Sequence, residues 1–190
     1  MNKKRLLQTI GLATKRGAGE RGRYLKEKNI FAFVGENVRF QPRLVPLYPK
    51  LIKLHNNIMV SAGIRFITHD ASFVVLNRLG LGQFPEEVGC IEVMDNVYIG
   101  YNATIMPNVR IDQNVIVGAG ALVSKDLGPN GVYVGIPAKK ICSFDDYVNR
   151  HKEISGVGGY SFPYVERNQY ISEEEIENAW KFFETGRTLK

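Results

Sequence analysis

The chain contains little cysteine, since only Cys90 and Cys142 among its 190 residues carry a thiol. Two cysteines without a recognisable spacing do not make a disulfide framework, so the composition predicts a reducing, cytoplasmic setting. Long apolar runs are also missing, and stretches such as Ile30 to Val34 are far too short to cross a bilayer. The first residues lack the apolar region of a signal peptide. These absences argue against a disulfide-stabilised secreted domain and against an integral membrane protein.

Negative charge is scarce near the beginning of the chain. Residues 1–28 carry nine lysines and arginines but only Glu20 and Glu27, whereas the whole chain has a formal net charge of +6. Such a segment can draw a protein to an anionic membrane or polymer surface, and the plainer interpretation is a solvated helix pair with one basic face. Nothing in the sequence resembles a helix-turn-helix, a zinc finger or an aromatic RNA-binding platform, so we expect no nucleic-acid partner.

A six-residue repeat is the strongest pattern that the sequence does contain. Between Ile91 and Val123 the first and third positions of every hexad are aliphatic, and Asn or Gly precedes each hexad after the first. Asn and Gly adopt positive φ at the lowest cost, so the pattern predicts short strands separated by tight corners. Repeats of six residues are typical of a parallel β-helix. The aliphatic positions are Ile91, Val93, Val97, Ile99, Ala103, Ile105, Val109, Ile111, Val115, Val117, Ala121 and Val123.

The repeat also runs earlier, from Ile52 to Phe66, in the same phase. The next corner position belongs to His69, and histidine is among the residues enriched at positive φ. The repeat stops there and resumes after Cys90, which holds the following corner position. We therefore predict that His69 occupies a left-handed corner and that residues 70–89 leave the coil there as a long loop. Long loops on a rigid scaffold are where function commonly resides.

Three sections follow from these patterns: a basic helical segment at residues 1–30, a β-helical domain at residues 31–141, and a helical extension at residues 142–190. Three hexads make eighteen residues, so a triangular coil would stack residues eighteen apart, such as Val93 on Ile111. The open ends of the coil need covering, and the terminal helices are the candidates.

Both terminal sections show helical spacing. Residues 3–28 read as two helices broken near residues 16–19, with Leu6, Leu7 and Ile10 as an apolar stripe. The C-terminal section predicts a helix at residues 145–153, a Gly-rich loop at residues 156–159, and a last helix that begins with a capping box at residues 172–175. Trp180 and Phe183 on that last helix are predicted to be packing residues.

The repeat and two motifs at its end resemble the left-handed β-helix, hexapeptide-repeat acyltransferases. The motifs are Val-Ser-Lys-Asp at residues 123–126 and Val-Gly-Ile-Pro-Ala-Lys-Lys at residues 134–140. The most similar branch holds the galactoside and maltose acetyltransferases and the O-acetyltransferases of capsule and lipopolysaccharide sugars. The resemblance implies an all-β solenoid, a left-handed parallel β-helix with helices at both ends. The left hand comes from the family alone, because general crossover statistics favour right-handed connections.

The resemblance implies acetyl transfer from a thioester to a hydroxyl, which needs a general base, donors for the oxyanion and alignment of both substrates. Histidine suits the base because its unperturbed pKa lies near neutrality. The family carries its catalytic histidine in a context like residues 67–70, so we predict His69 as the base. The alternative is a corner residue tolerated for its backbone. Asp70 could orient it, although adjacent residues of an extended segment point apart and a backbone carbonyl serves equally well. His55 and His151 are predicted to lie on the surface, and Thr68 to be structural.

The family also implies acetyl-CoA as the acyl donor, in a groove beside the β-helix. By position, its pantetheine arm would pass Tyr101 and Ala119, with backbone contacts near Ala103 and Gly120. The nucleotide end and the 3′-phosphate would meet a hydroxyl and cations, which serve a phosphate well. The alternative for the lysines is ordinary surface charge. The candidates for that end are Ser124, Lys125, Lys139 and Lys140, the last as a substitute for an arginine that the galactoside branch tends to carry where this chain has Cys142.

The acceptor is implied to be a sugar or glycan precursor, and the loop offers Asp70 and Arg78 as candidate contacts. The family further implies a homotrimer with active sites between subunits, His69 from one and part of the CoA groove from the next. N-acetylation of a nucleotide-linked aminosugar, acetylation of an antibiotic, and a non-catalytic scaffold subunit stay open. We predict no metal site, since a zinc enzyme of this shape needs three ligands, His151 falls outside the repeat, and no histidine lies one coil beyond His69.

Overall fold

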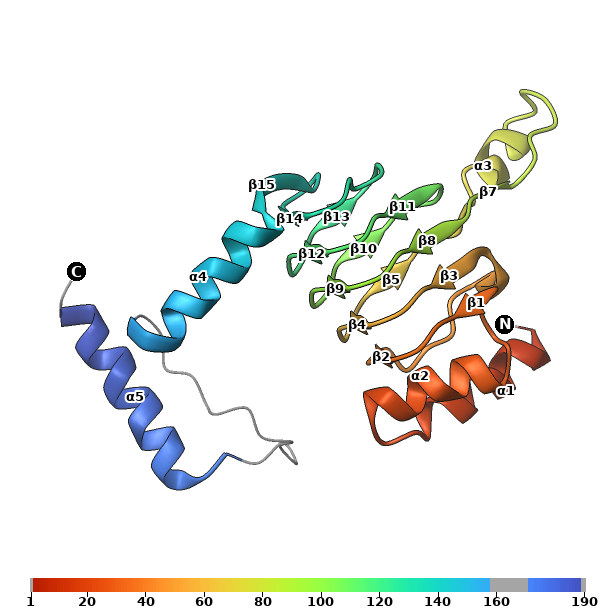
Figure 1. Cartoon of the computed structure of the whole chain (residues 1–190). Helices are drawn as coiled ribbons and strands as arrows, with labels where there is room; N and C mark the ends of the chain where they lie inside the picture. Colours follow the sequence, from red (N-terminus) through yellow and green to blue (C-terminus); the bar gives the residue numbers. More distant parts are fainter. Residues whose placement is uncertain (1, 158–170, 189–190) are drawn as a thin grey trace. The chain divides into compact units, whose positions relative to one another are not determined.

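The computed structural model describes residues 2–157 and 171–188, which divide into two compact units, Met1–Tyr147 and Val148–Lys190. Three parallel sheets build the first unit, and strands that follow one another in the chain belong to different sheets (Figure 1). Sheet A contains β1 (Phe33–Val34), β3 (Ile52–Leu54), β8 (Ile91–Val93) and β11 (Val109–Ile111). Sheet B contains β2 (Val38–Phe40), β4 (Ile58–Val60), β9 (Val97–Ile99), β12 (Val115–Val117), β14 (Gly131–Val134) and the antiparallel β15 (Lys139–Ser143). Sheet C contains β5 (Arg65–Phe66), β10 (Thr104–Ile105) and β13 (Leu122–Val123).

The register of the sheets confirms the predicted eighteen-residue coil. Val93 of β8 pairs with Ile111 of β11, and Thr104 of β10 pairs with Leu122 of β13. Every aliphatic position of the repeat between residues 91 and 123 is buried, none more than 3% exposed. Parallel stacking satisfies the backbone groups of neighbouring coils while one continuous apolar core fills the interior.

The predicted corners are confirmed at the Asn and Gly positions. Asn57, Asn96 and Asn114 have φ between 55° and 61°, and Gly63 and Gly120 have φ near 70°. At one corner the asparagine side chains form a ladder: Asn57 donates to Asn96, Asn96 to Asn114, and Asn114 to Asn130, at 2.8–2.9 Å. The left-handed backbone therefore also lines up amide groups that hydrogen bond along the coil.

This ladder carries a measurable share of the stability. Asn114→Ala is expected to lower the free energy of unfolding by about 2–3 kcal/mol, because alanine is strained at positive φ and two amide hydrogen bonds are lost. Asn114→Gly loses the same hydrogen bonds without the strain, so it is expected to cost about 1 kcal/mol. Urea denaturation followed by circular dichroism measures both values. Equal losses in the two variants would contradict the role assigned to the backbone conformation.

The prediction of a left-handed corner at His69 is wrong. Neither His69 nor Cys90 has a positive φ. His69 instead belongs to β6 (His69–Asp70), which pairs antiparallel with β7 (Glu87–Val88), His69 lying opposite Val88. An antiparallel ladder requires extended backbone, so the pairing keeps His69 out of the left-handed region.

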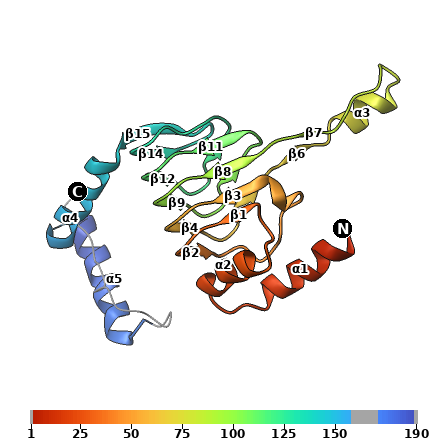
Figure 2. The same ribbon diagram turned by 45° about the vertical axis from the view of Figure 1, so that its right-hand side comes forward.

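The excursion itself occurs where the sequence predicts it. The ribbon of β6 and β7, with α3 (Phe73–Arg78) beyond it, forms an arm that projects from the coil (Figure 2). Asn57 bonds an asparagine 39 residues away across the arm, whereas Asn96 bonds one 18 residues away. The first separation is longer because it includes the arm, and the strands after the arm pair in register with those before it, so the coil resumes in phase.

Two helices at the N-terminus cover one end of the coil, as predicted (Figure 1). They are α1 (Lys3–Ala13) and α2 (Ala18–Glu27). Gly22 lies so close to the coil that a Cβ there would stand 1.8 Å from the Val38 carbonyl oxygen, so only glycine fits. Arg21, 5% exposed, donates from Nε to the Phe40 carbonyl at 2.8 Å, and burial lowers the pKa of its guanidinium. Side-chain bonds to backbone thus fasten the helices to β2.

The apolar stripe predicted on α1 is not the face through which the helix packs against the coil. Leu6, Leu7 and Ile10 are 42%, 61% and 52% exposed. Thr9 and Leu12 are buried instead, and the Thr9 hydroxyl accepts the backbone N–H of Val45. The helix therefore docks partly through polar contacts, which an apolar pattern does not reveal.

The remaining helices are α4 (Phe144–Val157) and α5 (Glu173–Thr188), together with the short 3-10 helix η1 (Pro49–Leu51). The helix predicted at residues 145–153 thus extends through the first two positions of the predicted Gly-rich loop, and residues 158–159 lie outside the described residues. The capping box is confirmed, since Ser172 and Glu175 exchange hydrogen bonds between side chain and backbone N–H. Trp180 and Phe183 contact each other edge-to-face with ring centroids 5.6 Å apart. No helix in the described ranges is long and apolar enough to span a membrane.

Candidate functional site

His69 stands at the stem of the arm, where the coil and the ribbon meet. It follows Thr68, whose buried hydroxyl donates to the Leu47 carbonyl at 2.6 Å, which confirms the structural role predicted for that threonine. The imidazole is half-buried and meets the Tyr48 ring edge-on, with centroids 5.7 Å apart. Two neighbours thus position it: the pairing with Val88 fixes its backbone and the tyrosine ring supports its side chain.

One nitrogen of this imidazole is unsatisfied. Nδ1 of His69 is buried and has no hydrogen-bond partner among the described residues, and it is the one buried side-chain nitrogen or oxygen there in that condition. A buried polar atom left without a partner costs about 1–3 kcal/mol, and such atoms concentrate at functional sites. Within one chain, therefore, no hydrogen bond to Nδ1 fixes the orientation of the His69 ring.

Asp70 does not hold the imidazole through a hydrogen bond. Its Oδ1 accepts the backbone N–H of Ser72 at 2.6 Å, and this bond, ahead of the charge of His69, lowers the pKa of the Asp70 carboxyl. The carboxylate thus closes the turn into α3. Arg78 lies exposed near the end of α3, further out on the arm.

The other histidines lie away from this stem. His55 is half-buried on sheet A's outer side, where its Nε2 lies 3.0 Å from Glu92 Oε1 and its ring contacts Phe33 at 5.2 Å. The same contact lowers the pKa of Glu92. His151 is exposed on α4, as predicted. Among the described residues, no three His, Cys, Asp or Glu side chains stand close enough to hold a metal ion.

The residues predicted along the pantetheine arm gather at the corner between sheets B and C. Tyr101 and Ala119 are exposed there on adjacent coils, and the Gly120 N–H donates to the Tyr101 carbonyl at 2.8 Å. Ala103 is fully buried, and its N–H and carbonyl already bond Gly100 and Arg65 within the coil. The corner thus offers a small exposed residue, Ala119, beside an aromatic ring.

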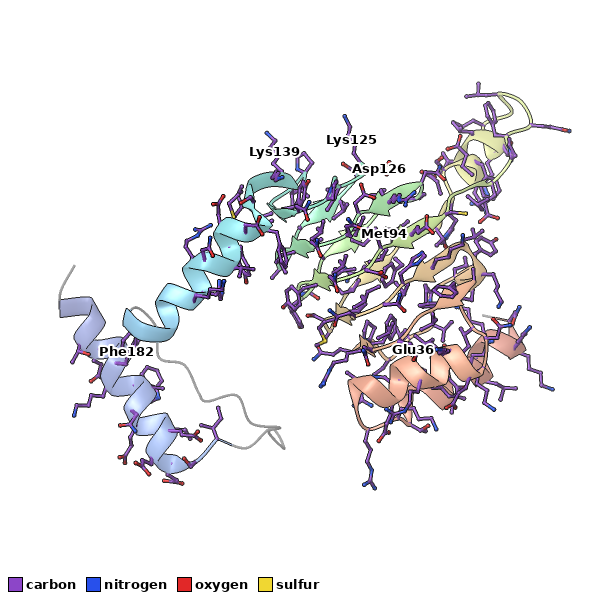
Figure 3. All side chains as sticks on the ribbon, viewed as in Figure 1. Glu36, Met94, Lys125, Asp126, Lys139 and Phe182 are labelled. Carbon is purple, nitrogen blue, oxygen red and sulfur yellow. The ribbon has the colours of Figure 1, made fainter. Side chains whose placement is uncertain are left out.

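Of the candidates for the nucleotide end, Ser124 and Lys125 follow β13 at the far end of sheet C, whereas Lys139 and Lys140 lie on β15 of sheet B, opposite Val134 and Tyr133. Figure 3 shows the side chains of Lys125 and Lys139 projecting outward from the coil. Leu122, at the start of β13, donates its N–H to Gly135 and accepts from Ala138 through its carbonyl, so the segment before Lys139 runs beside the corner that holds Ala119. Ser124 and Lys140 are also exposed, and no lysine of this group forms an ion pair with a described residue. These cations are available to an anionic ligand.

Within one chain, the fold separates His69 from Tyr101 and Ala119. The strands of sheet C separate the two groups. Tyr101 and Ala119 lie just before β10 and β13, at the start of the sheet, whereas His69 lies beyond the end of the neighbouring strand β5. Six residues connect Gly63 at one corner to His69 at the other, which corresponds to about 20 Å of extended chain. The predicted site residues therefore form two groups rather than one pocket in a single subunit.

Tyr48 is a site residue that the sequence analysis missed. Its backbone is left-handed, with φ 49°, an uncommon conformation for an aromatic residue. Its hydroxyl donates to the Glu86 carboxylate at 2.8 Å, and this bond raises the pKa of Tyr48. The available signal was the segment between Pro46 and Pro49, which interrupts the spacing just before the repeat. Unlike Asp70, Tyr48 touches the imidazole.

Comparison with known proteins identifies the repeat. Residues 91–125 match the family model described as bacterial transferase hexapeptide (six repeats). The chain is 39% identical over 134 residues to Protein CapG of Staphylococcus aureus, covering 70% of the chain and 75% of that protein. It is 28% identical over 141 residues to galactoside O-acetyltransferase of Escherichia coli, covering 63% and 67%.

Other similarities differ in extent. A putative acetyltransferase of Schizosaccharomyces pombe, C18B11.09c, is 37% identical over 94 residues, but the chain spans only 42% of its length. The structure of a galactoside acetyltransferase in complex with coenzyme A superposes with a TM-score of 0.56 at 23% identity, covering 90% of this chain and 89% of that one. That likeness shows a common fold. With three quarters of CapG covered at 39% identity and the family model matching the repeat, the chain belongs to the hexapeptide-repeat acyltransferases, as the resemblance predicted.

Proposed function

We propose that this protein transfers an acetyl group from acetyl-CoA to a hydroxyl of a sugar or glycan precursor. The observation that carries the proposal is His69, a half-buried histidine supported by Tyr48 at the stem of the arm. The similarity to a galactoside O-acetyltransferase, and to a galactoside acetyltransferase structure that holds coenzyme A, supports both the donor and the acceptor class.

In the proposed mechanism Nε2 of His69 takes the proton of the acceptor hydroxyl, because Nδ1 is buried. The hydroxyl oxygen attacks the thioester carbonyl carbon directly, and the carbon–sulfur bond of the tetrahedral intermediate then breaks. The imidazolium returns its proton to the departing thiolate, so the products are the acetyl ester and coenzyme A. A positioned base of this kind contributes about 100-fold to 10,000-fold to the rate.

The residues present fit the proposed donor at both ends. Small, exposed Ala119 lets a pantetheine chain approach the backbone beside Tyr101, while Ser124, Lys125, Lys139 and Lys140 offer a hydroxyl and unpaired cations for phosphates. Ala103 and Gly120 contribute by shaping that corner, since their N–H groups are engaged within the coil.

We further propose a homotrimer, with a coil of left-handed sense, in which each active site lies between two subunits. The separation of His69 from Tyr101 and Ala119 across sheet C supports this, because a neighbouring subunit can bring its own corner against the first subunit's arm.

The test is release of free thiol from acetyl-CoA in the presence of sugars, sugar phosphates and nucleotide sugars, together with the melting temperature with and without acetyl-CoA. Acceptor-dependent release and a raised melting temperature are expected, since a ligand that binds the native state stabilises it. Absence of both effects would contradict the proposal and favour a scaffold subunit. Faster release with amino sugars than with their hydroxyl counterparts would instead indicate N-acetylation.

A further inference from the structure

A cavity of about 560 Å³ lies next to Tyr48 and Val88, the two residues that position His69. The start of α1, residues 28–30 and 47–51, and Val88 of β7 line it. Tyr48 forms part of this lining and also packs against the His69 ring, while Val88 pairs with His69 in the ribbon. The volume lies within the range of about 300–1,000 Å³ that small-molecule sites occupy. A molecule in this cavity is thus held one side chain away from the proposed base.

The charged residues that line the cavity are all cationic. They are Lys4, Arg5, Lys28 and Lys50, and none forms an ion pair with a described residue. Arg5 Nε donates to the Val45 carbonyl, and Lys50 Nζ donates to the Asn29 amide and the Phe31 carbonyl. These acceptors are neutral, so they leave the positive charges uncompensated.

The remaining lining is largely apolar and includes Ile30, Leu47 and Pro49. An apolar wall suits the carbon face of a sugar ring, whereas a group of cations suits a phosphate. A neutral glycoside would fill the apolar part and leave the cations partly desolvated without a counter-charge, which is unfavourable. Glu86, whose carboxylate accepts from the Tyr48 hydroxyl, is not part of the lining and forms no ion pair with these cations.

We propose that this cavity binds the phosphate-bearing end of the acceptor, which is then a phosphate-bearing sugar, with its phosphate held by Lys4, Arg5, Lys28 and Lys50 and its acetylated hydroxyl reaching past Tyr48 to His69. The inference rests on the proposed function and narrows its substrate. It also gives the basic N-terminal segment a specific role, since Lys4 and Lys28 belong to the charge excess of residues 1–28. A free sugar phosphate and the sugar end of a nucleotide sugar share this chemistry.

The test compares α-D-glucose 1-phosphate and UDP-glucose with methyl α-D-glucoside, by calorimetric binding and by thiol release from acetyl-CoA. The Lys4→Gln/Lys28→Gln variant removes two cations that form no hydrogen bond with a described residue, so the fold is expected to persist. The control, Lys3→Gln/Arg23→Gln, changes the net charge equally at exposed helix positions outside the lining. Binding of at least one phosphate-bearing probe is expected to weaken about tenfold or more in the first variant and to stay within about twofold in the control.

The identity of the phosphate-bearing probe that binds shows whether the ligand is a free sugar phosphate or a nucleotide sugar. Equal transfer to methyl α-D-glucoside, unchanged by Lys4→Gln/Lys28→Gln, would overturn this inference and leave the proposed acetyl transfer intact. Phosphate-probe binding that depends on Lys4 and Lys28 without any thiol release would support the anion-binding cavity and count against the transfer itself. Equal weakening in both double variants would overturn the inference, as would binding only to phosphatidylglycerol vesicles, which would assign the cations to a membrane surface.

Discussion

His69→Ala is expected to lower the rate of acetyl transfer about 100-fold or more while leaving acetyl-CoA binding within about twofold. The imidazole is the group proposed to take the hydroxyl proton, and no other histidine in the described ranges lies at the stem of the arm. The backbone pairing of residue 69 with Val88 does not involve the side chain, so the ribbon is expected to persist. Steady-state thiol release and the shift in melting temperature with acetyl-CoA measure the two quantities.

His55→Ala is the matched control for this experiment. It also removes a half-buried imidazole from the coil, but one that contacts Glu92 and Phe33 rather than the arm. Its rate of transfer is expected to stay within about twofold of the unmodified protein, with a modest loss of stability because Glu92 loses a partner. A rate loss in His55→Ala comparable to that in His69→Ala would show that the effect reports on folding rather than on a base.

The body of the fold was predictable because each coil repeats the same local physics. Inward positions such as Val93 and Ile111 must be aliphatic, and corners such as Asn114 need a residue that tolerates positive φ. These requirements recur every six residues, so the pattern reinforces itself along the chain. The eighteen-residue register follows from it, and the pairing of β8 with β11 confirms that register.

The stem of the arm was not predictable in the same way. Extending the six-residue spacing placed His69 at a corner, but the strand that decides its conformation lies 19 residues later, at Val88. Such an antiparallel pairing leaves no periodic signal, because each of its strands has only two residues. The sequence therefore predicted where the arm leaves the coil, but it missed the ribbon that sets the conformation of His69.

The cavity next to Tyr48 and Val88 was hidden for a related reason. It forms because α1 docks beside Leu47 and Tyr48 through bonds such as that from Arg5 to the Val45 carbonyl. Side chain-to-backbone bonds of this kind depend on tertiary placement rather than on spacing. The basic composition of residues 1–28 was visible in the sequence, but only the docked helix shows which of those charges face a common space.

Mixing two inactive variants in one oligomer is expected to restore activity, because the proposed site draws its halves from different subunits. His69→Ala lacks the base, whereas Ala119→Trp fills the corner proposed for the pantetheine chain while retaining His69. In a trimer assembled at random from equal amounts of the two, about one site in four pairs an intact base with an intact corner. Thiol release is therefore expected to rise from about 1% of the unmodified rate, or below, to about a quarter of it.

The mixed oligomers are made by co-expression with different affinity tags and two-step purification, so that only particles containing both chains are assayed. Such selection removes pure oligomers and raises the expected fraction to about one site in three. Sedimentation analysis of the same sample measures the number of subunits. The matched control pairs His69→Ala with His69→Asn, which leaves every site without its base and is expected to stay inactive. If each chain instead holds a complete site, every site in the His69→Ala and Ala119→Trp mixture carries one defect, and no recovery occurs.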